Sequence, residues 1–183
     1  MMKTEIIQSL ASIQRLFEAE LIASIKAASA QKSPYGYALL LGEDLEMAYP
    51  IAVTNCESDL VDPTDTYSRY IPDEWLEWHD DHFAKVKHAY KALYQVFTQA
   101  YTVTDEDFCY TEVALEFMEQ LYGMYLAAMK KVIGQFPDVS YWIIWISDSD
   151  RAIISESFWA LNSDHVREEA AIYFEQPSVS THS

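Results

Sequence analysis

The stretch that decides the fold is YWIIWISDSDRAI, residues 141–153. Six large apolar or aromatic residues run without polar alternation into Ser147-Asp148-Ser149-Asp150. Because a strand with one solvated face alternates apolar and polar residues, this run predicts a strand buried on both faces. We therefore expect a central strand over residues 141–147, followed by a helix over residues 150–161.

The rest of the chain supplies a second β segment and several helices. YGYALLLGEDLEMAYPIAVT, residues 35–54, has two β-prone runs around a turn-prone Gly-Glu-Asp and predicts an antiparallel hairpin. Apolar residues recur at helical spacing over residues 3–30, 83–97 and 114–132. We expect one α+β domain over residues 3–175, with a small, mainly antiparallel sheet (hairpin 35–54 plus central strand 141–147) covered by about five to six helices. We expect residues 176–183 to form a disordered tail.

The charge of the chain limits its partners. There are 12 basic and 29 acidic residues, a formal net charge of −17, and residues 42–81 hold 12 acidic residues and one basic residue, Arg69. Such a surface repels nucleic acid and anionic lipid, which we exclude as partners, and favours a basic protein or a cation. An acidic surface also serves solubility alone, and the charge does not choose between these uses.

Cysteine usage and local motifs give little sign of chemistry. Two distant cysteines, Cys56 and Cys109, form neither a disulfide framework nor a zinc pattern and suit a reducing compartment. The N-terminal segment carries charges through its apolar positions, unlike a signal peptide, so we expect a cytoplasmic protein. Neither a GxSxG elbow nor a glycine-rich phosphate loop is found. We predict no cofactor or metal and no catalytic residue, and we lean against an enzyme.

Two acidic motifs have both a functional and a structural interpretation. Asp148 and Asp150 follow the predicted strand, where ligands of α/β sheets often bind, but Ser147 or Ser149 and the aspartates also suit the capping of the next helix. We favour capping. In WHDDH, residues 78–82, His79 and His82 have spacings that can chelate a metal, yet they and His88 lack a HExxH pattern. We expect solvated surface residues there.

A second candidate site is the aromatic segment TYSRYIPDEWLEW, residues 66–78. An arginine among aromatic residues can orient a carboxylate or stack on a ring, so Arg69 with Tyr67, Tyr70 and Trp75 forms a candidate binding set. The alternative is that Arg69 pairs with an internal aspartate and that the aromatic residues belong to the core or its rim.

Several segments together resemble a known family. VTNCESDL, SRYIPDEW, WISDSD and SFWALN occur in this order after a helix and the YGYALLL strand. Over about residues 3–162 this is similar to the bacterial proteins grouped as domain of unknown function 4303. The strongest parts of the resemblance are the segment around Arg69 and Pro72 and the Ser-Asp-Ser-Asp followed by Ser157, Leu161 and Asn162. The resemblance implies no activity, because that of the family is not known.

Three functions remain open from the sequence. The favoured one is a non-catalytic protein-binding module that masks a basic partner, as immunity proteins do with nuclease toxins. The second is a small-molecule or metal-dependent enzyme that uses Arg69 with Asp148 and Asp150. The third is a homo-oligomeric structural or regulatory protein whose exposed aromatic residues form the interface.

Overall fold

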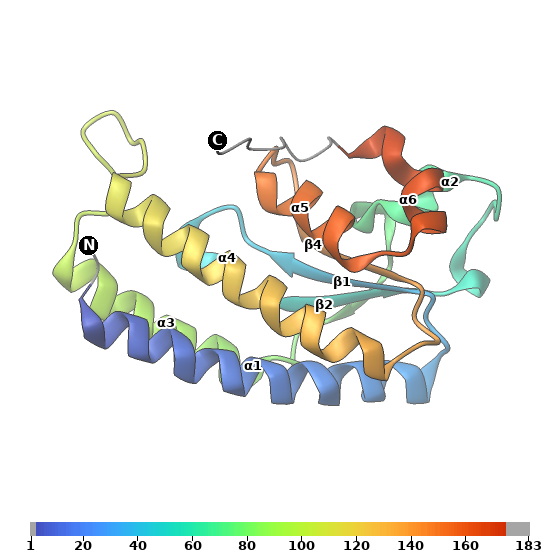
Figure 1. Cartoon of the computed structure of the whole chain (residues 1–183), viewed down its shortest axis with the longest axis horizontal. Coiled ribbons are helices and arrows are strands. Elements are labelled where there is room, and N and C mark those ends of the chain that lie inside the picture. Colours follow the sequence, from blue (N-terminus) through green and yellow to red (C-terminus); the bar gives the residue numbers. More distant parts are fainter. Residues whose placement is uncertain (1–2, 175–183) are drawn as a thin grey trace, which may run out of the picture.

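The structure, a computed structural model, describes residues 3–174 and is α+β (Figure 1). The predicted tail, residues 176–183, lies outside the described residues, as does residue 175. Among residues 3–174, no helix combines the length and the apolar character that crossing a membrane requires. The helices and strands in chain order are α1 (Thr4–Gln31), β1 (Gly36–Leu41), β2 (Ile51–Asn55), α2 (Thr66–Tyr70), β3 (Glu77–His79), α3 (Ala84–Ala100), α4 (Glu112–Val132), β4 (Tyr141–Ile146), α5 (Ala152–Leu161) and α6 (Asp164–Ala170).

The four strands form one mixed sheet in the order β3-β2-β1-β4. The hairpin prediction is confirmed: β1 and β2 are antiparallel, with Ala38 opposite Val53. β2 and β3 are also antiparallel, so the sheet is mainly antiparallel as expected. β4 runs parallel to β1, from Gly36 opposite Tyr141 to Leu41 opposite Ile146. The parallel pairing brings the carboxyl ends of β1 and β4 to the same end of the sheet.

The prediction that residues 141–147 form a central strand is wrong, because β4 lies at the edge of the sheet. Five of its six residues are nevertheless buried, and Trp145 is half-buried. The apolar run indicates that the strand is buried. At this edge of the sheet, helices bury β4 in place of a second neighbouring strand.

Helices cover one face of the sheet, and a short aromatic segment covers the other. On the first face, Tyr37 of β1 contacts Ser24 of α1 through their hydroxyls, 2.5 Å apart, and its ring packs on Trp142 of β4. α1 in turn packs against α3 and α4 (Figure 1). On the opposite face, Trp75 packs on Tyr141 of β4, with 5.8 Å between ring centroids. The chain between β2 and β3 is therefore part of the core.

Side chains of α5 complete the hydrogen bonding of the β4 edge. Asn162, which follows α5, accepts a hydrogen bond from the Trp142 amide at 2.8 Å and donates one to the Trp142 carbonyl at 2.7 Å. Ser157 of α5 accepts from the Ile144 amide at 2.9 Å. Both side chains are buried. An edge strand normally leaves alternate amides and carbonyls open to another strand, and here two polar side chains occupy them.

Candidate functional site: an acidic cleft with aromatic walls

An open cleft of about 670 Å³ lies at the carboxyl ends of β1 and β4. Four segments that are far apart in the sequence build it: the turn after β1, the α2 segment, the loop between β4 and α5, and the short 3-10 helix after α6. Its lining residues are Glu43, Tyr67, Ile71, Asp73, Trp145, Asp148, Ser149, Asp150 and Tyr173.

The loop between β4 and α5 places two of the carboxylates in the cleft. Asp148 takes a left-handed backbone conformation with φ 54°, which turns the chain sharply after the strand. Ser147 donates a hydrogen bond to the Asp73 carboxylate at 2.5 Å and so ties this loop to the α2 segment. Asp148 and Asp150 of this loop line the cleft together with Tyr67 and Asp73.

The prediction that this polar run caps the next helix is wrong. The N-cap residue of α5 is Arg151, and no side chain hydrogen-bonds to the helix amides from that position. Ser149 accepts a hydrogen bond from the amide of Arg151 at 3.3 Å. Arg151 precedes the first helical residue, so this bond does not cap an amide of the helix. The aspartates therefore line the cleft without satisfying the orphan amides that capping would require.

The lining of the cleft suits an organic cation. Glu43, Asp73, Asp148 and Asp150 contribute four carboxylates, and its lining residues include no lysine, arginine or histidine. Aromatic rings form part of the wall: Tyr67 and Tyr173 meet edge to face with 5.7 Å between centroids. Ammonium and guanidinium groups bind favourably to both carboxylates and aromatic faces.

Trp145 lines the cleft, but its indole N–H is shielded from the open space. Among the described residues it has no hydrogen-bond partner, although the atom itself is buried. Within residues 3–174, no three His, Cys, Asp or Glu side chains are grouped closely enough to hold a metal ion. With a volume of about 670 Å³, the cleft has room for a ligand larger than a bare ion.

Arg69 is held outside the cleft by a bidentate ion pair. Its two terminal nitrogens donate to the two Glu57 carboxylate oxygens at 2.7 and 2.8 Å, and its guanidinium lies 4.8 Å from the centroid of the Tyr35 ring. The hydrogen bonds from Arg69 hold the pKa of Glu57 below its usual value. Arg69 is therefore paired with an acid, as the sequence alternative expected, but the partner is a glutamate instead of an aspartate and its side chain is 62% exposed. Joint action of Arg69 with Asp148 and Asp150 stays a prediction without a supporting contact.

Tyr70 and Trp75 lie in the core. The Tyr70 hydroxyl donates to Glu169, and its carbonyl accepts from the Tyr141 hydroxyl at 2.8 Å. Trp75 is 2% exposed and lies over Gly36, where a Cβ atom would come within 2.7 Å of the indole ring. Of the six binding residues predicted from sequence, the cleft therefore brings together Tyr67, Asp148 and Asp150. Glu43, Asp73, Trp145 and Tyr173 were missed because only the tertiary fold joins them.

The histidines of the WHDDH motif are less solvated than expected. His79 and His82 are half-buried and stack with 4.5 Å between ring centroids, whereas His88 is exposed as predicted. His82 shares a 2.7 Å hydrogen bond with the buried Ser24, and His79 shares one of 3.1 Å with Thr54 of β2. The pair thus links α1 to the sheet.

This pair predicts a loss of stability in mild acid. Burial, and then the neighbouring His82, lower the pKa of His79. The unfolded chain therefore binds the proton first as the pH falls through about 6.5, and the free energy of unfolding decreases. Urea denaturation at about pH 7.5 and about pH 5.5 should show a smaller decrease for His79→Gln than for the native protein. His88→Gln is the control, and an equal change in both variants would contradict the prediction.

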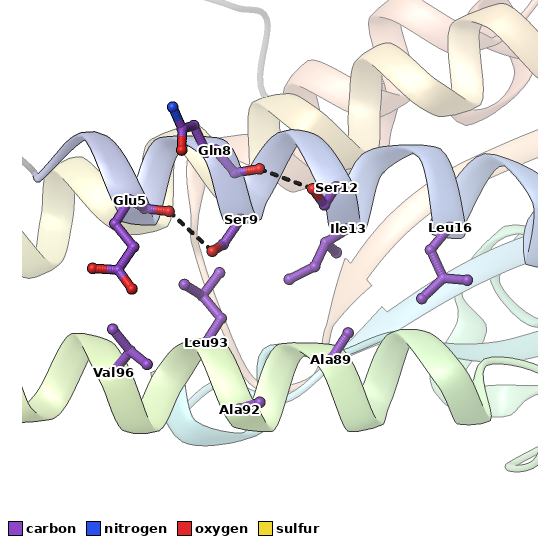
Figure 2. Close-up of a pocket in the computed structure, with 10 residues that line it drawn as sticks. All are labelled: Glu5, Gln8, Ser9, Ser12, Ile13, Leu16, Ala89, Ala92, Leu93 and Val96. Carbon is purple, nitrogen blue, oxygen red and sulfur yellow. Dashed lines mark hydrogen bonds between the residues drawn. The ribbon is translucent and has the colours of Figure 1, made fainter.

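A groove of about 500 Å³ between α1 and α3 is a weaker candidate (Figure 2). Its two serine hydroxyls are already used: Ser9 and Ser12 donate to the carbonyls of Glu5 and Gln8 in the same helix, at 2.9 and 3.1 Å. The opposite wall presents alanine, leucine and valine from α3. The groove is concave, as binding sites are, but it lacks polar groups that converge on a ligand.

Comparison of the chain with protein-family models, with curated proteins and with solved structures gives no match. The resemblance to domain of unknown function 4303 therefore stays a prediction, and the cleft is interpreted from its own geometry.

Proposed function

We propose that the protein binds a basic segment of a partner protein and that the cleft receives a lysine or arginine side chain of that segment. The observation that carries the proposal is the lining of the cleft, which joins four carboxylates to aromatic rings without a basic side chain. An extended side chain that ends in a cation can lay its methylenes on Tyr67 and Trp145 and place its charge between Asp73 and Asp148.

The charge of the whole chain supports the same partner. With a formal net charge of −17, the protein attracts a basic surface over distances comparable to the Debye length. Complementary charge of this kind mainly raises the association rate and suppresses acidic competitors. The complex is therefore expected to form quickly and to weaken with added salt.

The biological setting that we propose is inhibition by masking in the cytoplasm, as immunity proteins do with basic nuclease toxins. Both cysteines are free thiols, Cys56 buried and Cys109 exposed, which suits a reducing compartment. The enzyme and homo-oligomer alternatives stay predictions.

The proposal predicts that the double variant Asp148→Asn/Asp150→Asn weakens binding of a lysine-rich peptide by about tenfold or more at low salt. The neutral amides keep the shape of the side chains and remove two of the four charges. Fluorescence anisotropy of the labelled peptide measures the change, and an acetylated peptide of the same sequence tests the need for charge.

The matched control is Asp80→Asn/Asp81→Asn, which removes the same net charge at exposed positions before α3. We expect it to change the affinity by less than about threefold, because screened charges at a distance contribute little. Equal weakening by both double variants would show that net charge alone attracts the peptide, and it would contradict a role for the cleft.

A further inference from the structure

A second cavity, of about 440 Å³, lies between α4 and α5 on the other side of Arg151 from the acidic cleft. Its inner wall is formed by the buried side chains of Met118, Tyr122 and Ile153. The α4 and α5 helices are in contact, and residues of both line the cavity. The cavity lies within the size range of small-molecule sites.

Two hydrogen-bond donors on residues that line this cavity are shielded from solvent and have no acceptor among the described residues. Tyr122 is 6% exposed, and within residues 3–174 its hydroxyl has no hydrogen-bond partner. The buried Nε of Arg151 likewise lacks a partner among the described residues. A buried polar group without a partner costs about 1–3 kcal/mol, so the free energy falls when these side chains rotate to the cavity surface and meet an acceptor on a ligand.

The Tyr122 hydroxyl and the Arg151 guanidinium are suited to bind an anionic group. Burial raises the pKa of Tyr122 to about 12, and the charge of Arg151 acts in the opposite direction. The phenol therefore keeps its proton and donates beside a permanent cation. A carboxylate accepts from both a hydroxyl and a guanidinium, and charge-assisted bonds of this kind are the strong ones.

The rim of the cavity has the opposite charge. Glu119 and Glu156 line it from α4 and α5, and both are exposed. A ligand with a carboxylate at the inner donors and a cation near the rim satisfies both ends, whereas a simple anion meets repulsion at the entrance.

Gly123 lines the cavity at an exposed position of α4. It lies in the middle of α4, where glycine disfavours a helix, and a Cβ atom built on it has no atom within 4 Å. The position thus has room for a side chain that the sequence does not use. A small residue here leaves space between α4 and α5 for a ligand.

From these contacts we infer that the cavity between α4 and α5 binds a small zwitterion with an apolar body, such as an α-amino acid with an apolar side chain. Arg151 and Tyr122 bind its carboxylate, Met118 and Ile153 contact its side chain, and Glu119 or Glu156 attracts its ammonium group. The inference is independent of the acidic cleft, and Asp148→Asn/Asp150→Asn should leave it unchanged.

The experiment uses three probes that differ in one group: L-phenylalanine, L-phenylalaninamide without the carboxylate, and 3-phenylpropionate without the ammonium. Calorimetry measures affinity, and the methyl NMR signals of Met118 and Ile153 report the site. We expect phenylalanine to bind about tenfold more tightly than either analogue. Arg151→Met should remove its advantage over the amide, whereas Arg15→Met, at an exposed position of α1, should not.

Gly123→Leu should abolish the shifts of both methyl signals by filling the cavity, and Gly123→Ala should retain them. The inference is overturned if no probe shifts these signals at millimolar concentration, or if Gly123→Leu binds phenylalanine as the native protein does. Equal binding of 3-phenylpropionate and phenylalanine would overturn the role of the ammonium group. Loss of peptide binding in the acidic cleft with amino-acid binding retained would separate the two sites.

Discussion

Asn162→Leu is expected to lower the free energy of unfolding by about 3 kcal/mol or more. Asn162 is 5% exposed and bonds to both the amide and the carbonyl of Trp142. Leucine fills a similar volume but leaves both backbone groups buried without a partner. Such groups cost far more than the net value of the bonds that are lost. Urea denaturation monitored by tryptophan fluorescence measures the change.

Two further variants test whether the hydrogen bonds are responsible. Ser157→Ala removes the acceptor of the Ile144 amide and should cost about 1–3 kcal/mol, while Ser155→Ala on the same helix should cost less than about 0.5 kcal/mol. Asn162→Asp keeps the acceptor for the Trp142 amide but places a negative oxygen beside the Trp142 carbonyl. A stability of Asn162→Leu within 1 kcal/mol of the native protein would show that the β4 edge does not need these side chains.

Trp75→Ala is expected to destabilise the fold by about 3–5 kcal/mol. The indole ring lies between Gly36 of β1 and Tyr141 of β4 and fills the second face of the sheet. Removing it leaves a cavity that the surrounding strands cannot close. Trp78→Ala is the matched control from the same segment, because Trp78 is 48% exposed and should cost less than about 1 kcal/mol.

The same contact predicts a coupling with Gly36. In the native protein, Gly36→Ala places a methyl group 2.7 Å from the Trp75 ring and should cost about 1–3 kcal/mol. In the Trp75→Ala background the obstacle is absent, so the same change should cost little. A double-mutant cycle by urea denaturation measures the difference. Additive effects would mean that Gly36 is needed for a reason other than the approach of Trp75.

Periodicity predicted most elements because burial leaves a local pattern. The α1, α3 and α4 helices follow from apolar spacing, and the hairpin follows from two β-prone runs around a turn-prone Gly-Glu-Asp. The position of β4 at the edge of the sheet did not follow from apolar spacing. A strand covered by helices has the same apolar sequence as a strand between two neighbouring strands. Two buried polar residues, Ser157 of α5 and Asn162 directly after it, bond to the outer edge of β4. Only the fold shows that they have this role. The three-residue β3 is too short for a period to show.

The candidate site was predictable only in part. Asp148 and Asp150 were found because they follow an apolar strand, but the sequence favoured capping, a local role that the geometry of α5 does not show. Arg69 drew attention as the single basic residue in an acidic stretch, and that isolation reflects its pairing with Glu57. Glu43 and Tyr173 lie 130 residues apart along the chain, so no local pattern could join them.

The parallel pairing of β1 with β4 has a consequence for biosynthesis. The ribosome makes residues 36–41 more than a hundred residues before their partners at 141–146, and the side chains that protect the outer edge follow later still. Until then β1 has only β2 as a neighbour and its other edge is open, and closing so long a loop is slow. Productive folding therefore waits for nearly the whole polypeptide, and chains truncated before residue 162 are expected to aggregate or be degraded.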